Sequence, residues 1–214
     1  MQVAIVLYPG FTGLDVFGPY ELLRSLPESK LRFVYHQKGL VTADSGVLRV
    51  QATHTFDETP KPDIILVPGS GTDTLNVIKD ESLLQWLRQV HQTTEMTLSV
   101  CTGSIILAAA GILKDKPATT HWAAQDYLSQ FGAYSKPNDR IVKAGKVITS
   151  AGVSAGIDLA LLVVDELCGR KYAEQAQLRI EYDPQPHLDC GHPSKVSQEC
   201  LTDAAQKLKE NINL

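Results

Sequence analysis

A series of short, almost wholly apolar runs constrains the fold of this chain more than any other feature of its sequence. The runs are too short for long helices, and their unbroken apolar character is typical of strands buried on both faces of a sheet. Turn residues end two of them, at Pro9-Gly10 and Pro68-Gly69. We therefore predict buried strands at residues 3–7, 63–67 and 96–100.

Segments with helical spacing of apolar residues alternate with these strands. Helices are predicted over residues 14–25, 72–78, 81–92, 102–113, 121–131, 154–168 and 170–182, with a last amphipathic helix from about Ser194. Further strands are predicted at residues 31–36, at 47–52 (alone or in a hairpin) and in a hairpin at 140–149 that turns at Ala144-Gly145. Strands that alternate with helices form βαβ units, which favour a mostly parallel sheet covered on both faces.

The chain shows no repeat and no linker that would divide it. We predict a single α/β domain over residues 1–184. The polar segment that follows, residues 185–214, is predicted to pack on or near the same domain.

The composition argues against two classes of partner. A net charge of -4 favours neither nucleic acid nor a membrane surface, because both would require a basic face. No apolar run reaches the length of a membrane span, and residues 1–10 lack the features of a signal peptide. Four cysteines without a Cys-x-x-Cys pair indicate free thiols in a reducing cytoplasm. Cys190 and His192 are too few ligands for a metal site.

Cys101 lies at the junction of a predicted strand and an alanine-rich helix, in Ser99-Val-Cys-Thr-Gly103. A strand that runs directly into a helix holds its turn residue in a strained and exposed position, as in the nucleophile elbow of hydrolases. The helix N-terminus would favour the reactive thiolate. The alternative is that Cys101 is a small apolar residue of the core.

Two other loops follow strands that end at the same edge of such a sheet, where ligands of open α/β folds bind. The backbone amides of Gly69 and Ser70, with that of Thr102, could form an oxyanion or anion site. Asp15, after the first strand, could exchange a proton with the thiol. The alternatives are an ordinary Pro-Gly-Ser-Gly turn and an acid that serves a helix dipole.

The residues resemble the ThiJ/PfpI superfamily of flavodoxin-like cysteine proteins, and within it the isonitrile hydratase branch. The similarity spans residue 14 to about 184. It is carried by Leu14-Asp15 with Gly18-Pro19, Pro68-Gly69, Ser99-Val-Cys-Thr-Gly-Ser104, Ala109-Ala-Gly-Ile-Leu113, Ala118-Thr-Thr-His-Trp122, Ala155-Gly-Ile-Asp158 and Gln177-Leu-Arg-Ile-Glu-Tyr182.

The resemblance implies a flavodoxin-like three-layer α/β/α sandwich and a homodimer that acts on a small molecule without a metal or organic cofactor. It implies that Cys101 is the nucleophile, with Asp15 and Thr102 as its catalytic neighbours. It also implies that the backbone of Gly69 and Ser70 forms the anion-binding loop.

At two positions this sequence differs from other branches of the superfamily, and both differences favour the hydratase branch. Peptidase-like members carry a histidine directly after the cysteine, and Thr102 cannot act as a base at neutral pH. Asp15 stands where many members have a glutamate, which favours the hydratase branch. His121 could relay a proton, although capping and packing a helix is the slightly favoured alternative.

Three functions follow as hypotheses. The first is a cofactor-independent hydratase or lyase that adds water to an isonitrile through the Cys101 thiolate. The second is a glyoxalase or deglycase acting on small aldehydes. The third is a non-enzymatic sensor in which Cys101 is oxidised to a sulfinic acid.

Overall fold

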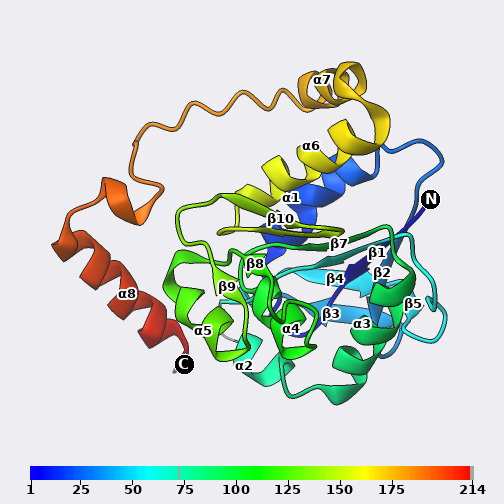
Figure 1. Cartoon of the computed structure of the whole chain (residues 1–214), viewed down its shortest axis with the longest axis horizontal. Helices are drawn as coiled ribbons and strands as arrows, with labels where there is room; N and C mark the ends of the chain where they lie inside the picture. Colours follow the sequence, from blue (N-terminus) through cyan, green and yellow to red (C-terminus); the bar gives the residue numbers. More distant parts are fainter. Residues whose placement is uncertain (72, 213–214) are drawn as a thin grey trace.

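A seven-stranded, mostly parallel sheet forms the centre of the protein. The computed structural model describes residues 1–71 and 73–212. The strand order is β10-β11-β7-β6-β1-β2-β5, and only the β10–β11 pair is antiparallel (Figure 1). The strands are β1 (Gln2–Val6), β2 (Lys30–Tyr35), β5 (His54–Thr55), β6 (Ile64–Val67), β7 (Met96–Ser99), β10 (Ile141–Ala144) and β11 (Val147–Ser150).

The strands predicted from continuous apolar runs are confirmed as the central strands β1, β6 and β7. Ile5, Ile65 and Leu66 have no exposed surface, because helices cover both faces of the sheet here. The mostly parallel sheet predicted from the alternation of strands and helices is therefore correct.

Helices pack on the two faces of the sheet (Figure 1). On one side α1 (Gly13–Leu23) packs against α6 (Ala155–Cys168), which also contacts α7 (Arg170–Arg179). On the other side α4 (Gly103–Ala109) contacts α3 (Glu81–Thr93), α2 (Thr74–Val77) and α5 (Gln125–Gln130). Within the described ranges, no helix is both long and apolar enough to cross a bilayer.

The helix predicted over 72–78 is observed as Thr74–Val77, with residue 72 outside the described residues, and the helix predicted over 170–182 ends at Arg179. Two other predicted helices differ more from those observed. The helix predicted over 102–113 ends at Ala109, because Gly111 adopts a φ of 79° and the chain turns away. The helix predicted over 121–131 is split into a 3₁₀ turn, η1 (Trp122–Ala124), followed by α5. The two-residue strands β8 (Pro117–Ala118) and β9 (Tyr134–Ser135), which flank this region, were not predicted.

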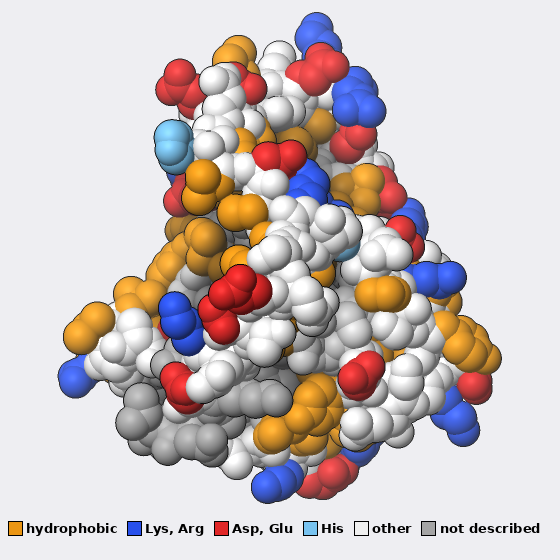
Figure 2. Space-filling model, turned by 90° about the vertical axis from the view of Figure 1, so that its left-hand side faces the viewer, with side chains coloured by type: hydrophobic (Ala, Val, Ile, Leu, Met, Phe, Trp, Pro, Cys, Tyr) orange, Lys and Arg blue, Asp and Glu red, His pale blue; other side chains and the backbone are white. Residues whose placement is uncertain are grey.

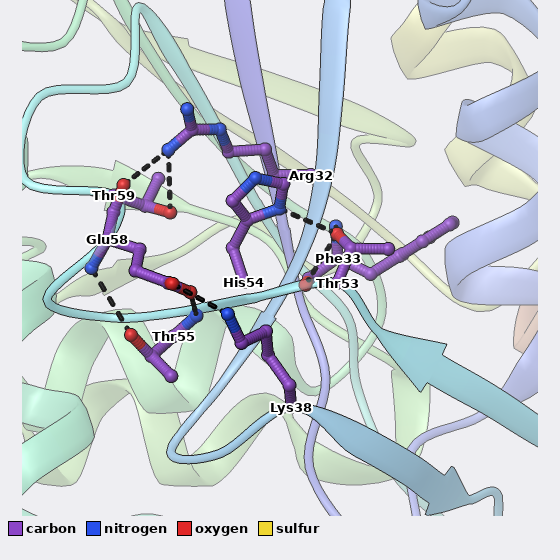
Figure 3. Close-up of polar contacts among 8 residues, drawn as sticks. All are labelled: Arg32, Phe33, Lys38, Thr53, His54, Thr55, Glu58 and Thr59. Carbon is purple, nitrogen blue, oxygen red and sulfur yellow. Dashed lines mark hydrogen bonds and ion pairs between the residues drawn. The ribbon is translucent and has the colours of Figure 1, made fainter.

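Residues 47–52 belong to a hairpin, the second of the two predicted alternatives. Here β4 (Arg49–Ala52) pairs with β3 (Gly39–Thr42). Side chains fix the neighbouring edge of the main sheet (Figure 3). The Glu58 carboxylate accepts from Lys38 Nζ at 2.7 Å and from the Thr55 amide at 2.9 Å, and the Arg32 guanidinium donates to the Glu58 carbonyl. The hydrogen bond from Lys38 is the main reason that the Glu58 pKa lies below its usual value.

The chain after Tyr182 leaves the domain as an extended segment, and we call residues 183–212 the C-terminal arm. It contains η2 (Pro193–Lys195) and α8 (Gln198–Ile212), so the helix predicted from about Ser194 begins at Gln198. In Figure 1, α8 stands beside the domain and outside its layers. Residues 213–214 lie outside the described part, and packing of the whole 185–214 segment on the domain stays a prediction.

Candidate active site

Cys101 occupies a strained turn between β7 and α4. Its φ is 55°, a conformation that costs a residue other than glycine about 1–3 kcal/mol. The residue is 5% exposed and lies at the carboxyl end of a central strand. The strained turn agrees with the prediction of a nucleophile elbow, whereas the predicted exposure is wrong, because Cys101 is buried among core residues.

The surrounding groups hold this turn in place. A Cβ on Gly103 would lie 2.1 Å from the Val67 carbonyl oxygen, so only glycine allows α4 to begin against the end of β6. The Cys101 amide donates to the Ala151 carbonyl at 2.9 Å. The Cys101 carbonyl accepts from Thr120 Oγ1 at 2.9 Å and from Ser104 Oγ at 3.2 Å. Both backbone polar groups of the strained residue are thus satisfied.

Asp15, in the first turn of α1, is fully buried beside the thiol. Its Oδ2 accepts from the Gly69 amide at 2.8 Å, whereas Oδ1 has no hydrogen-bond partner among the described residues. Burial raises its pKa to about 7, aided by the Asp44 charge, and the Gly69 amide and the Cys101 thiol partly oppose that rise. The carboxyl is therefore about half protonated at neutral pH, and Oδ1 is the oxygen left to carry the proton.

The Cys101 thiol is kept protonated by its surroundings. Burial and then the Asp15 charge raise its pKa well above the usual value, while the Thr102 backbone and side chain and the Val153 amide favour the thiolate. The predicted effect of the helix N-terminus is outweighed, because α4 has only seven residues and the thiol is desolvated. Thiol and carboxyl thus compete for protons as a pair.

The loop predicted to bind an anion is clamped by side chains. Thr102 Oγ1 accepts from the Ser70 amide at 2.9 Å and donates to the Ser70 carbonyl at 3.0 Å, and Thr74 Oγ1 lies 2.7 Å away. Tyr8 donates to the Pro68 carbonyl at 2.7 Å. An anion bound by the Gly69 and Ser70 amides would have to replace Asp15 and Thr102 as acceptors. Anion binding by these amides stays a prediction. Through its two hydrogen bonds to Ser70, the Thr102 hydroxyl holds the loop in position.

His121 caps η1. Its Nδ1 accepts from the Ala123 amide at 3.3 Å, so the ring proton lies on Nε2. The ring centroid lies 5.4 Å from that of Trp122, and burial lowers the His121 pKa, which leaves the ring neutral at neutral pH. These contacts support the capping and packing interpretation. The ring also reaches the loop after β11, where a Cβ on Gly152 would lie 3.0 Å from His121 Cδ2.

A cavity of about 1150 Å³ opens beside this site. One wall comes from the domain and the other from the C-terminal arm, on the side of the molecule seen in Figure 2. Three residues of the domain wall contact Cys101: Thr120 and Ala151 through hydrogen bonds and Val153 through its amide. The cavity wall therefore touches the Cys101 backbone and, through Val153, the thiol, while Cys101 itself is not among the described residues that line the cavity.

Sequence reasoning missed several residues of the site. Thr120 lies inside a motif that was recognised, but its contact with Cys101 depends on the fold. Val153 carried no sequence signal, because the loop after β11 reaches Cys101 only through the β11–β7 pairing. Across the described ranges, no three His, Cys, Asp or Glu side chains gather as metal ligands. Cys168, Cys190 and Cys200 are free thiols.

Comparisons with known proteins agree with this geometry. A family model described as the DJ-1/PfpI family matches residues 1–166. An isonitrile hydratase from Pseudomonas putida is 37% identical over 214 residues, which is 100% of this chain and 92% of that protein. A crystal structure of a ThiJ/PfpI family protein from Pseudomonas syringae superposes with a TM-score of 0.93 at 36% identity, over 99% of this chain and 87% of that one. A glutathione-independent glyoxalase, DJR-1.2 from Caenorhabditis elegans, is 28% identical over 107 residues, 50% of this chain and 56% of that protein.

Proposed function

The chain belongs to the DJ-1/PfpI family, and from that premise we propose that it is a cysteine-dependent hydratase that converts an isonitrile and water to an N-substituted formamide. The full-length similarity to an isonitrile hydratase supports this reaction over others. The observation that carries the proposal is the buried Asp15 carboxyl, with one oxygen fixed by Gly69 and the other unpaired beside Cys101. Such a carboxyl can take a proton from the thiol and give it to a substrate.

In the first half of the reaction, Asp15 takes the thiol proton as the sulfur of Cys101 bonds to the terminal carbon of R–N≡C. Asp15 then delivers that proton to the same carbon, which gives a thioimidate, R–N=CH–S–enzyme. A pKa of about 7 suits both directions of this transfer, because the carboxyl binds and releases the proton with little driving force near neutral pH.

In the second half, water adds its oxygen to the thioimidate carbon and the nitrogen gains a proton. The carbon–sulfur bond breaks as the carbonyl forms, and the hydroxyl proton returns to the Cys101–Asp15 pair. The product is R–NH–CHO, so one isonitrile and one water give one formamide. The amides of Thr102 and Val153, which favour the thiolate in the resting site, stabilise the sulfur as it leaves.

Formamide production from several alkyl and aryl isonitriles tests the proposal directly. We expect turnover by the wild type and its loss in Cys101→Ala and Asp15→Asn, with the fold retained in circular dichroism. Cys168→Ala, which alters a half-buried thiol on α6, is the matched control and should keep full activity. The proposal is wrong if the wild type forms no formamide, or if Cys101→Ala remains active.

A second candidate is a glyoxalase-type reaction, which the partial similarity to a glyoxalase favours. There Cys101 would add to an aldehyde carbon and Asp15 would move the proton. Lactate formation from methylglyoxal, measured beside the isonitrile assay, separates the two reactions. The sensor hypothesis uses the same thiol, and peptide mass spectrometry after mild peroxide treatment would test for selective oxidation of Cys101 over Cys168.

We also propose a homodimeric and cytoplasmic protein, on the basis of the family resemblance and the free thiols. Light scattering coupled to size exclusion would test the dimer. The small-molecule substrate follows from the proposed reaction, in which the Cys101–Asp15 pair transfers the proton and the amides of Thr102 and Val153 stabilise the leaving sulfur.

A further inference from the structure

The cavity beside the site has two walls of different origin. The domain contributes Leu14, Trp122, Val153 and Ile157, which present apolar groups. The C-terminal arm contributes the facing wall through residues 184–195, including Leu188 and Gly191. A volume of about 1150 Å³ is enough for a ring-sized group together with ordered water.

The cavity wall includes a residue that contacts the reacting thiol. Val153 lines the cavity and directs its amide at the Cys101 sulfur, whereas Asp15 is fully buried and is not among the described lining residues. As the sulfur attacks the terminal carbon, the C≡N–R unit is still linear, so the N-substituent points away from the thiol. Val153 of the cavity wall bounds the space beside the sulfur through its amide, and Thr120 of the same wall donates to the Cys101 backbone carbonyl.

The charges that line the cavity are nearly all paired. Arg140 Nε donates to Asp158 at 2.6 Å, and Lys195 pairs with Asp189 in the arm. Asp139 adds one further carboxylate to the wall. The described lining therefore has no cation left over to pair with an anionic substrate. On the face in Figure 2, Lys and Arg side chains are scattered and do not form a basic patch.

We propose that this cavity receives the N-substituent of the substrate, that the C-terminal arm thereby sets substrate size, and that neutral apolar substituents are preferred over anionic ones. The inference rests on the proposed function for the identity of the reaction. The location of the pocket can be tested without it, through the reactivity of Cys101 itself.

Gly191 provides the variant that fills the cavity. A Cβ at this position would meet no atom within 4 Å, and the backbone needs no positive φ, so a large side chain can be placed there without strain. The matched control is Leu178→Trp, because Leu178 on α7 is 79% exposed and lies outside the cavity lining. Both variants are made with Cys190→Ser and Cys200→Ser, which remove the exposed thiols.

The first experiment compares alkylation of Cys101 by iodoacetamide and by the bulkier iodoacetanilide, with each peptide quantified by mass spectrometry. Gly191→Trp should lower the anilide-to-acetamide rate ratio at Cys101 by at least about tenfold, the discrimination that a methylene group can provide in an apolar pocket. Leu178→Trp should leave this ratio unchanged, and Cys168 serves as the internal reference. An unchanged ratio in Gly191→Trp would overturn the proposed pocket.

The second experiment compares kcat/KM for isocyanoacetate and for its methyl ester, which differ in charge at similar length. We expect the neutral ester to be preferred by at least about tenfold, since the anion would meet an unpaired carboxylate and no free cation. Equal turnover of both would overturn the charge preference. If the wild type hydrates no isonitrile, the proposed function fails, while the alkylation ratios still decide whether the cavity holds groups attached at Cys101.

Discussion

Asp15→Asn should stabilise the protein at neutral and alkaline pH while abolishing its proposed activity. The folded state holds the Asp15 proton up to a pKa of about 7, whereas an ordinary aspartate releases it near 3.8. The contribution of this group to stability is therefore most favourable below 3.8, and it decreases as pH rises to about 7. Above about pH 7 the folded state buries a charged carboxylate that the unfolded chain keeps in water, which lowers the free energy of unfolding.

The size of the effect follows from the two pKa values. At about 1.4 kcal/mol for each pH unit, the interval from 3.8 to about 7 corresponds to about 4 kcal/mol. An amide in place of the carboxyl can still accept the Gly69 hydrogen bond through its oxygen and carries no charge. Above about pH 7, Asp15→Asn should therefore be more stable than the wild type by up to about 4 kcal/mol, relative to their difference at about pH 4.

Urea unfolding of both proteins at intervals between about pH 4 and pH 8 measures this difference. Asp57→Asn, which changes an exposed carboxyl just after the edge strand β5, is the control for a general charge effect. The stability difference between wild type and Asp15→Asn should widen with pH, and that for Asp57→Asn should stay nearly flat. A pH-independent difference at Asp15 would refute the assignment of a raised pKa to a buried carboxyl.

Three further predictions concern the same site. The kcat/KM of isonitrile hydration should rise as pH passes through about 7, because the Cys101–Asp15 pair must lose one of its two protons before the sulfur can attack. A flat profile over that range would contradict proton transfer between Cys101 and Asp15. Gly103→Ala should lower the free energy of unfolding by about 1–3 kcal/mol, seen as a lower melting temperature, since its Cβ would lie 2.1 Å from the Val67 carbonyl oxygen. Gly191→Ala, whose Cβ would meet no atom within 4 Å, should melt like the wild type. Thr102→Val keeps the side-chain shape but removes the hydroxyl that accepts from the Ser70 amide and donates to the Ser70 carbonyl. Loss of these two hydrogen bonds should lower the free energy of unfolding in denaturant by about 1–3 kcal/mol and lower kcat, and wild-type stability in this variant would show that the hydroxyl does not hold the loop.

The central strands of the fold could be predicted because each is marked by a local pattern of apolar residues. Strands β1, β6 and β7 are continuous apolar runs, and burial on both faces demands such a composition. The end of α4 could not be placed, because the alanine-rich sequence continues past Ala109 and the left-handed turn at Gly111 decides the boundary. The strands β8 and β9 pair over two residues each, too short for any periodicity to show.

The candidate site was predictable only in part, for a similar reason. Cys101 comes just after β7, and Asp15 lies at the start of the helix that follows β1, so their position at the sheet edge could be inferred from sequence. Val153 and Thr120 reach the thiol from loops distant in the chain, and pairing of β11 with β7 is what brings the first of them there. The raised pKa of Asp15 also had no sequence signal, because it arises from complete burial.

The placement of the C-terminal arm has a consequence for how such a protein can diverge. The reacting pair and the groups that hold it lie within residues 1–154, whereas one wall of the cavity comes from residues 184–195 near the end of the chain. Substitutions and insertions in this exposed stretch leave the sheet and the elbow untouched. Under the proposed role of the arm, selectivity can drift while the proposed chemistry is conserved, and exchange of the arm between relatives should alter the substrate range.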